Sequence, residues 1–135
     1  MGKSGSIIAY NASFEKTILR HASETYTEYQ DWVTTTEERI IDLLVPFRGF
    51  LYYHPAQAGS ASLKDVLPAL TGITYDDIGD ITNGGMASAE YYRVTFDKGA
   101  EEKDRQRVYS ALEKYCDLDT RAMIKILEVL EKESL

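Results

Sequence analysis

With 135 residues, 44% of them hydrophobic, the chain is long enough to form one domain with a buried core, and its apolar runs fall far short of the ~20 residues that span a membrane. A single cysteine excludes an internal disulfide bond and favours a reducing compartment, so we expect a cytoplasmic protein. The net charge of −7 argues against a protein that holds nucleic acid with basic residues alone, although it permits an enzyme that meets phosphates through metal ions on its own carboxylates.

The first part of the chain predicts one strand followed by one long helix. Residues 1–6 are expected to form a flexible leader, and the apolar residues at 7–10 predict a short buried strand. Asn11 is a favourable N-cap for the helix that the apolar spacing predicts over residues 13–30. Glu15 falls on the apolar stripe of this helix, which is an unusual position for a carboxylate.

The middle of the chain predicts two shorter helices with a loop between them. Threonines followed by glutamates open a predicted helix at residues 34–47, which Pro46 limits. Residues 50–62 are aromatic and then rich in Pro, Gly and Ser, which predicts an extended piece leading into a loop. A short helix over residues 62–72 has a capping serine at its start and a glycine at its end, and its internal proline predicts a kink or an early stop.

The C-terminal part has the clearest helical pattern. Residues 82–85 predict a turn, and residues 86–96 predict a short helix with an irregular end. From residue 101 onward, side chains spaced by three and four residues define one face of a single helix, or of two consecutive helices that share a face: Val108, Leu112, Tyr115, Asp119, Met123, Ile126 and Leu130. Asp119 is the only charged residue in this series, and Tyr115 precedes it by one turn.

Two predicted core faces therefore carry one carboxylate each, Glu15 and Asp119. Burying an ionised carboxylate without a partner is costly. One interpretation makes both residues helix-terminal acids, with Glu15 in a first turn and Asp119 as an N-cap. The other interpretation places both at a cleft where they share a divalent cation, since Mg²⁺ prefers oxygen ligands and usually takes one or two protein carboxylates.

Several stretches resemble one group of nucleases. The segment "IIAYNASFE", with Asn11, Phe14 and Glu15, is similar to the second motif of the DnaQ-like (DEDD) 3′–5′ exonucleases, in which an aromatic residue and an acid follow an asparagine at a strand end. Tyr115 and Asp119 in "YCDLDT" match the Tyr-x-x-x-Asp motif of the tyrosine subgroup. Together with "GSASLKDVLPALTG" and "NGGMAS", these stretches resemble an uncharacterised bacterial domain family of that group, which often follows a RecB-like nuclease region in the same protein.

The resemblance implies a fold, an activity and a set of catalytic residues. The fold is ribonuclease H-like and α/β, and the activity is hydrolysis of nucleic acid phosphodiesters with Mg²⁺ or Mn²⁺. Glu15, which stands where most members have Asp, and Asp119 would be the metal ligands. Tyr115 would be the third catalytic residue, orienting the attacking water or helping to activate it.

The resemblance also implies substrate contacts, for which simpler interpretations remain open. Asn11, Phe14 and Lys64 would contact the nucleic acid strand, although for Lys64 the simpler interpretation, a solvated helix lysine, is favoured. Tyr115 has the alternative of a core tyrosine on a helix stripe. The two histidines lack a metal-ligand pattern, and Cys116 has no CxxC partner, so it is predicted to be a buried structural thiol.

The sequence differs from the exonuclease group at one essential point. The group begins with Asp-x-Glu on its first strand, and no Asp-x-Glu occurs in this sequence. We therefore expect residues 1–135 to be one partial nuclease domain, helix-dominated and lacking the first strands, with weak or absent metal binding and no activity as an isolated chain. The uncovered sheet edge predicts a homo-oligomer. The alternative function is a non-catalytic remnant that acts as a protein-interaction module.

Overall fold

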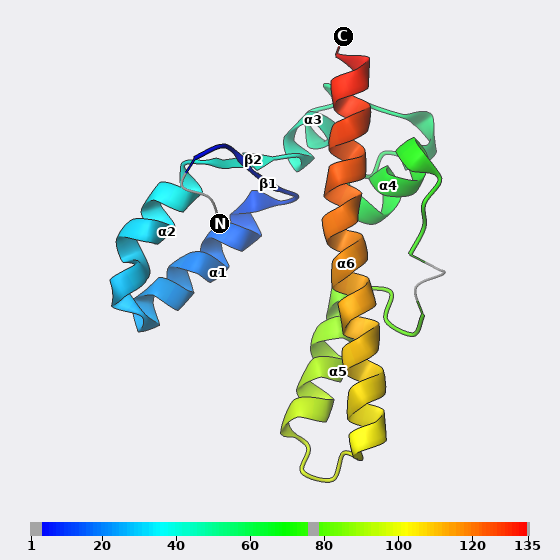
Figure 1. Cartoon of the computed structure of the whole chain (residues 1–135). Coiled ribbons are helices and arrows are strands. Elements are labelled where there is room, and N and C mark those ends of the chain that lie inside the picture. Colours follow the sequence, from blue (N-terminus) through cyan, green and yellow to red (C-terminus); the bar gives the residue numbers. More distant parts are fainter. Residues whose placement is uncertain (1–3, 76–78, 135) are drawn as a thin grey trace. The chain divides into compact units, whose positions relative to one another are not determined.

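The protein is helix-dominated, with a small sheet in its first half (Figure 1). A computed structural model describes residues 4–75 and 79–134. The elements are β1 (Ile7–Ala9), α1 (Ala12–Thr25), η1 (Thr27–Tyr29), α2 (Gln30–Glu37), β2 (Ile40–Asp42), α3 (Leu44–Arg48), η2 (Pro55–Gln57), α4 (Leu63–Thr71), α5 (Gly84–Phe96) and α6 (Glu102–Glu133). The general α/β class with helices dominating is therefore confirmed, whereas the ribonuclease H-like fold stays a prediction.

The chain divides into two compact units, Met1–Ala69 and Leu70–Leu135. The boundary falls in the last turn of α4. The prediction of one partial domain over the whole chain remains a prediction, and each unit is described by itself below. None of the helices that the structure describes combines the length and the apolar character needed to cross a membrane.

The first unit is built around a parallel pair of strands. β1 pairs with β2 in the register Ile7 to Ile40, and α1, η1 and α2 form the connection between them. Parallel strands need such a long crossover, usually a helical one. The predicted strand is confirmed over residues 7–9. Residues 1–3 of the predicted leader lie outside the described residues, while the Arg39 guanidinium donates hydrogen bonds to the carbonyls of Ser4 and Gly5.

The start of α1 is capped by a different residue from the one predicted. Asn11 adopts a left-handed conformation, with φ of 69°, and its side chain makes no capping hydrogen bond. Instead, its Oδ1 accepts a hydrogen bond from the Ser13 hydroxyl. The carboxylate of Asp42, at the end of β2, accepts from the backbone N–H groups of Asn11 at 2.9 Å, Ala12 at 3.0 Å and Leu44 at 2.9 Å. One carboxylate thus serves the starts of both α1 and α3.

The predicted helix over residues 34–47 is wrong, because its middle forms a strand. Thr34 and Thr35 lie near the end of α2, where their hydroxyls donate to carbonyls one turn back rather than capping a new helix. The β-branched pair within β2 then finds a partner in β1, and only residues 44–48 are helical. The predicted helix over residues 13–30 is likewise interrupted, since Tyr26 leaves helical geometry and α2 begins at residue 30.

Phe47 lies in the core of the first unit, and helix α4 begins and ends at its local signals. Phe47, which is 1% exposed, packs its ring against Tyr10 and Tyr52, with centroids 6.3 and 5.8 Å apart. The hydroxyl of Ser62 accepts from the Lys64 N–H at the start of α4, as predicted. Gly72, with φ of +74°, follows the end of α4, so the helix continues past its internal proline rather than stopping early.

The second unit is a pair of packed helices, α5 and α6. The Asn83 side chain caps α5 by accepting from the Met86 N–H at 2.8 Å, so the predicted turn at 82–85 leads directly into the helix. Residues 102–133 form one continuous helix, which decides between the two alternatives for this segment. Val94 on α5 and Val108 on α6 are both fully buried or nearly so.

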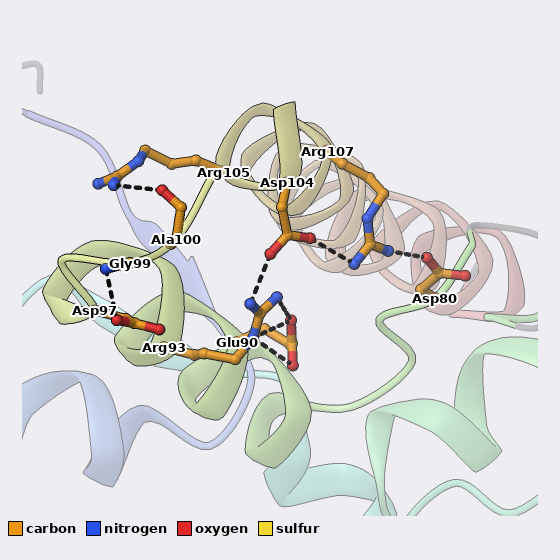
Figure 2. A network of polar contacts seen from close by, with 9 residues as sticks. All are labelled: Asp80, Glu90, Arg93, Asp97, Gly99, Ala100, Asp104, Arg105 and Arg107. Atoms are coloured by element: carbon orange, nitrogen blue, oxygen red, sulfur yellow. Dashed lines mark hydrogen bonds and ion pairs between the residues drawn. The ribbon is translucent and has the colours of Figure 1, made fainter. Parts of the chain in front are cut away.

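A chain of ion pairs links α5, α6 and the segment before α5 (Figure 2). Arg93 on α5 bonds Glu90 on its own helix and Asp104 on α6, at 2.7 and 2.6 Å. Asp104 also accepts from Arg107, which in turn reaches Asp80. Exposed ion pairs contribute little to stability singly, and a network of several contributes more.

We predict that Asp42→Ala destabilises the first unit by about 2 kcal/mol, because backbone N–H groups at two helix starts lose a charged acceptor. The single tryptophan, Trp32 on α2, lies in this unit, so urea unfolding followed by its fluorescence measures the change. Glu24→Ala, which removes an exposed carboxylate from α1, is the control and should change stability by less than about 0.5 kcal/mol. Equal stabilities of the two variants would contradict the prediction.

Candidate functional site

An open cleft of about 500 Å³ lies in the first unit, where β1 ends. Three segments form its walls: the residues after β1, helix α3 and the start of α4. The lining residues are Tyr10, Asn11, Leu44, Arg48, Ala61, Ser62 and Leu63. Clefts outside the carboxyl ends of parallel strands are the usual ligand sites of α/β proteins, so this cleft is the first candidate site.

Tyr10 ties the two sides of the cleft together. Its hydroxyl donates to the Ala61 carbonyl at 2.7 Å, across the cleft from the end of β1 to the start of α4. Partial burial, and then the nearby charge of Asp42, raise the pKa of Tyr10 well above its ordinary value. The phenol is therefore a fixed hydrogen-bond donor at neutral pH rather than an acid–base group.

The cleft carries one positive charge, that of Arg48. This arginine lies in the last turn of α3 and is exposed. None of the ion pairs among the described residues involves it. The Asn11 amide and the Ser62 hydroxyl add polar groups to the same lining. A guanidinium beside neutral hydrogen-bonding groups suits a phosphate or a carboxylate.

Glu15 and Phe14 are both exposed in the first turn of α1. The buried residues of this helix are Ala12 and Ser23, so the face that Glu15 shares is not a core face in the described chain. Ile18, on the predicted stripe, is 51% exposed. The prediction that Glu15 lies among buried apolar residues is therefore wrong, and its carboxylate is accessible to solvent or to a ligand.

Asp119, in the second unit, lies in a cluster with two tyrosines. The Tyr75 hydroxyl donates to Asp119 Oδ1 at 2.6 Å, and the rings of Tyr75 and Tyr115 are 6.0 Å apart. Both tyrosines are buried, with 5% and 9% of their surface exposed. Because α6 is continuous through this point, the interpretation of Asp119 as an N-cap is wrong. Its carboxylate instead sits in the middle of a helix and is satisfied by a phenol.

The two phenols are held in their protonated form. Burial raises the pKa of Tyr75 far above its ordinary value, and the hydrogen bond to Asp119 adds to the effect. Burial and the charge of Asp119 raise the pKa of Tyr115 to about 12. Tyr115 is therefore a buried tyrosine on the stripe of α6, and it also lies beside the acid Asp119. Its position is compatible with both interpretations, the core tyrosine and the residue that acts beside Asp119. Tyr75 lies outside every helical pattern, so the spacing of residues could not have indicated it.

The remaining predicted residues, Lys64 and Cys116, are not part of the cleft lining. Lys64 is half-buried and follows the lining residue Leu63 along α4, one position beyond the cleft wall. Cys116 is exposed, so its prediction as a buried thiol is wrong. Its neighbour on α6, Tyr115, faces the interior in its place.

The described residues provide no complete set of protein ligands for a metal ion. No group of three or more His, Cys, Asp and Glu side chains in residues 4–75 and 79–134 is arranged to hold one. Glu15 offers an accessible carboxylate in the first unit, and Asp119, in the second, offers a carboxylate that already accepts a hydrogen bond from Tyr75. Both have the oxygen ligands that Mg²⁺ and Mn²⁺ prefer, but each would need further ligands.

A second cavity, of about 370 Å³, lies within the second unit between α5, α6 and the segment that precedes α5. Its charged lining consists of Asp80, Glu90, Arg93 and Arg107, all members of the network in Figure 2. Each arginine already bonds two carboxylates, so the cations of this cavity are compensated. The cleft with Arg48 is the better candidate for an anionic ligand.

We predict that Tyr115 ionises at about 12 in the folded protein, compared with about 10 in an unfolded chain. The folded state then holds this proton more tightly than the unfolded state. The resulting stability is fully present below pH 10 and is lost as the pH rises towards 12.

Circular dichroism at a fixed urea concentration should show a smaller loss of helix between pH 10 and 12 for Tyr115→Phe than for wild type. Tyr92→Phe, at a position 68% exposed, is the control; an unchanged slope for Tyr115→Phe would contradict the prediction.

Comparison with known proteins gives a match to part of the chain. The family model described as Domain of unknown function (DUF2779) matches residues 1–62. This segment contains β1, β2 and every residue that lines the cleft except Leu63. Neither a curated protein nor a solved structure gives a significant match. The chain is thus similar to that family over its first unit, and the similarity brings no activity with it.

Proposed function

We propose that this chain is part of a metal-dependent 3′–5′ exonuclease-like domain that acts on nucleic acid phosphodiesters, and that the cleft in its first unit holds a phosphate of the strand. One observation carries the proposal. Two stretches that resemble the nuclease family, "YNASFE" and "SLK", are far apart in the sequence, yet Asn11 from the first and Ser62 from the second line the same cleft. Arg48, which no motif indicated, adds the cation there.

The chemistry of the cleft supports a phosphate ligand. A guanidinium can donate two parallel hydrogen bonds to a phosphate, and the amide and hydroxyl groups beside it can donate more. The excess of acidic residues elsewhere on the chain disfavours loose electrostatic binding, so contact with nucleic acid would depend on such a local site. Phe14 and Lys64, at the starts of α1 and α4, would contact the strand on either side of it.

In this proposal Glu15 and Asp119 are the metal ligands of the chain. Bound Mg²⁺ or Mn²⁺ would supply positive charge to the phosphoryl oxygens during cleavage. The hydrogen bond from Tyr75 orients the Asp119 carboxylate. Tyr115 stays protonated at neutral pH, so its role would be to position a water molecule by hydrogen bonding and not to remove a proton from it.

The absent Asp-x-Glu limits what these residues could do alone. The proposal requires two further acids, those that the resembling group carries on the first strand of its sheet, supplied by a preceding segment or by another chain. A RecB-like nuclease region, which often accompanies the resembling family, would be a further partner in the same protein. Residues 1–135 by themselves would then bind metal weakly and cleave little or nothing. The two short strands would be completed by strands added at an edge of the sheet, either from that segment or from a second copy of the chain.

We predict that Arg48→Gln weakens binding of a single-stranded oligonucleotide to this chain by about tenfold at low salt, since one charge-assisted phosphate contact is lost. Fluorescence anisotropy of a labelled oligonucleotide measures the affinity. Arg121→Gln makes the same charge change at an exposed site on α6 and should have less effect. Equal effects of the two variants would show that the cleft is not the site.

A second measurement tests the catalytic part. A protein that joins this chain to a preceding segment encoding Asp-x-Glu should degrade single-stranded DNA or RNA from the 3′ end with Mn²⁺. Glu15→Gln and Asp119→Asn should each abolish the degradation, because each removes one metal ligand. Absence of activity in that longer protein would overturn the exonuclease proposal.

The alternative function is a protein-interaction module, and exposed apolar side chains favour it. Those along the segment from α1 to α2 include Phe14, Ile18, Tyr26, Tyr29 and Trp32. Where such side chains form a contiguous surface, they mark a contact with another protein or another domain. If Arg48→Gln leaves oligonucleotide binding unchanged and the longer protein is inactive, this alternative is the better description of the chain.

A further inference from the structure

The loop that follows α3 has an aromatic residue in a conformation that favours glycine. Helix α3 ends at Arg48 with Gly49 as its C-cap, and Phe50 then adopts a left-handed conformation with φ of +53°. The Phe50 N–H donates to the Phe47 carbonyl at 3.2 Å, and the Leu51 N–H donates to the Pro46 carbonyl at 2.9 Å. This pair of hydrogen bonds is the Schellman motif, in which the left-handed residue is usually glycine.

Phe50 gains no burial in return for this backbone conformation. A bulky side chain at positive φ is strained, because its Cβ crowds the backbone. The ring of Phe50 is 66% exposed, and the next residue, Leu51, is 80% exposed. A glycine would satisfy the same hydrogen bonds without strain. A residue whose type disfavours its backbone conformation, and whose side chain gains no burial there, is a candidate for a functional role.

The exposed ring belongs to a pair. The rings of Phe50 and Tyr53 have centroids 5.7 Å apart and are inclined at 44°. Tyr53 is 44% exposed, and its hydroxyl accepts from the Gly59 N–H at 3.2 Å, which restrains its ring. The pair therefore presents two aromatic side chains to solvent, and the Tyr53 ring is held in place. Such surfaces bind flat apolar or aromatic groups by stacking.

A charge close to this pair along the chain indicates the kind of ligand. Arg48, the cation of the cleft, lies two residues before Phe50, in the last turn of α3. A single strand of nucleic acid carries an anionic phosphate and a flat base in every nucleotide, so it suits a segment that supplies both a cation and an exposed aromatic pair. An apolar peptide would match the rings but would leave Arg48 without a counter-ion.

We propose that Phe50 and Tyr53 form a stacking platform for an unpaired nucleobase, next to the phosphate held at the Arg48 cleft. The inference rests on the proposed function for the phosphate and extends it to the form of the substrate, which is a single strand with its bases free. A paired duplex keeps its bases stacked within the helix and would not use the platform. A protein partner at the same rings is the competing occupant.

The test compares two oligonucleotides of equal phosphate number, one with bases and one with abasic sites, on the full 135-residue chain. Phe50→Gly should weaken binding of the base-containing strand by about tenfold and leave binding of the abasic strand unchanged. Glycine suits the left-handed position, so this variant should unfold at a urea concentration no lower than wild type. Phe50→Tyr keeps a ring and should bind as wild type.

Ala58→Gly is the matched control. Ala58 is exposed and also has positive φ, at +51°, but it carries no ring. This substitution relaxes the backbone in the same way and should leave both affinities unchanged. An equal loss on the two oligonucleotides, or no loss at all in Phe50→Gly, would overturn the stacking platform.

The outcomes also separate this inference from the proposed function. If Phe50→Gly has no effect but Arg48→Gln weakens binding of both oligonucleotides, the phosphate site is supported and the stacking platform is contradicted. If Arg48→Gln has no effect while Phe50→Gly weakens binding of the base-containing oligonucleotide alone, the phosphate site is contradicted and the stacking platform is supported. If the wild-type chain binds neither oligonucleotide, both proposals fall and the competing protein partner is favoured.

Discussion

The carboxylate of Asp42 organises the first unit. Backbone N–H groups at the start of a helix have no partner within the helix, and leaving them buried and unpaired is costly. Asp42 ends β2 and accepts from the first N–H groups of α1 and from the start of α3. Through this one side chain, the carboxyl ends of both strands are held together. The cleft follows from that arrangement, since Asn11 and Leu44 are two of its walls.

Asp119 has a comparable position in the second unit, where it accepts from Tyr75 and lies beside Tyr115. Burial keeps both phenols protonated, so they stabilise the carboxylate as donors. The unusual carboxylates of the sequence therefore have different explanations. Asp119 is a half-buried acid with polar partners, and Glu15 is an exposed acid on a helix whose apolar side chains are largely accessible. An exposed acid and an oriented acid are both suitable metal ligands within a larger set.

The elements that could be predicted are those whose signals are local. The three- and four-residue spacing around Tyr115 predicted α6, the apolar run before Tyr10 predicted β1, and Ser62 and Gly72 marked the ends of α4. The elements that could not be predicted depend on distant partners. Residues 40–42 are a strand because β1 lies beside them, although the threonines before them favour a helix. The left-handed conformation of Phe50 could not be predicted either. It is set by hydrogen bonds back to α3, whereas a phenylalanine by itself disfavours positive φ.

Residue spacing and residue type, read along the chain, were enough to identify the buried face of α6, the acids Glu15 and Asp119, and the resemblance to a nuclease group, because each of these depends on neighbours within a few residues. The tertiary structure determined which polar groups lie close to one another. It placed Asp42, and not Asn11, at the start of α1, it brought Tyr75 to Asp119, and it joined Arg48 to the cleft. Such pairings join residues from separate segments, and only the packing of strands and helices determines which of them lie within hydrogen-bonding distance.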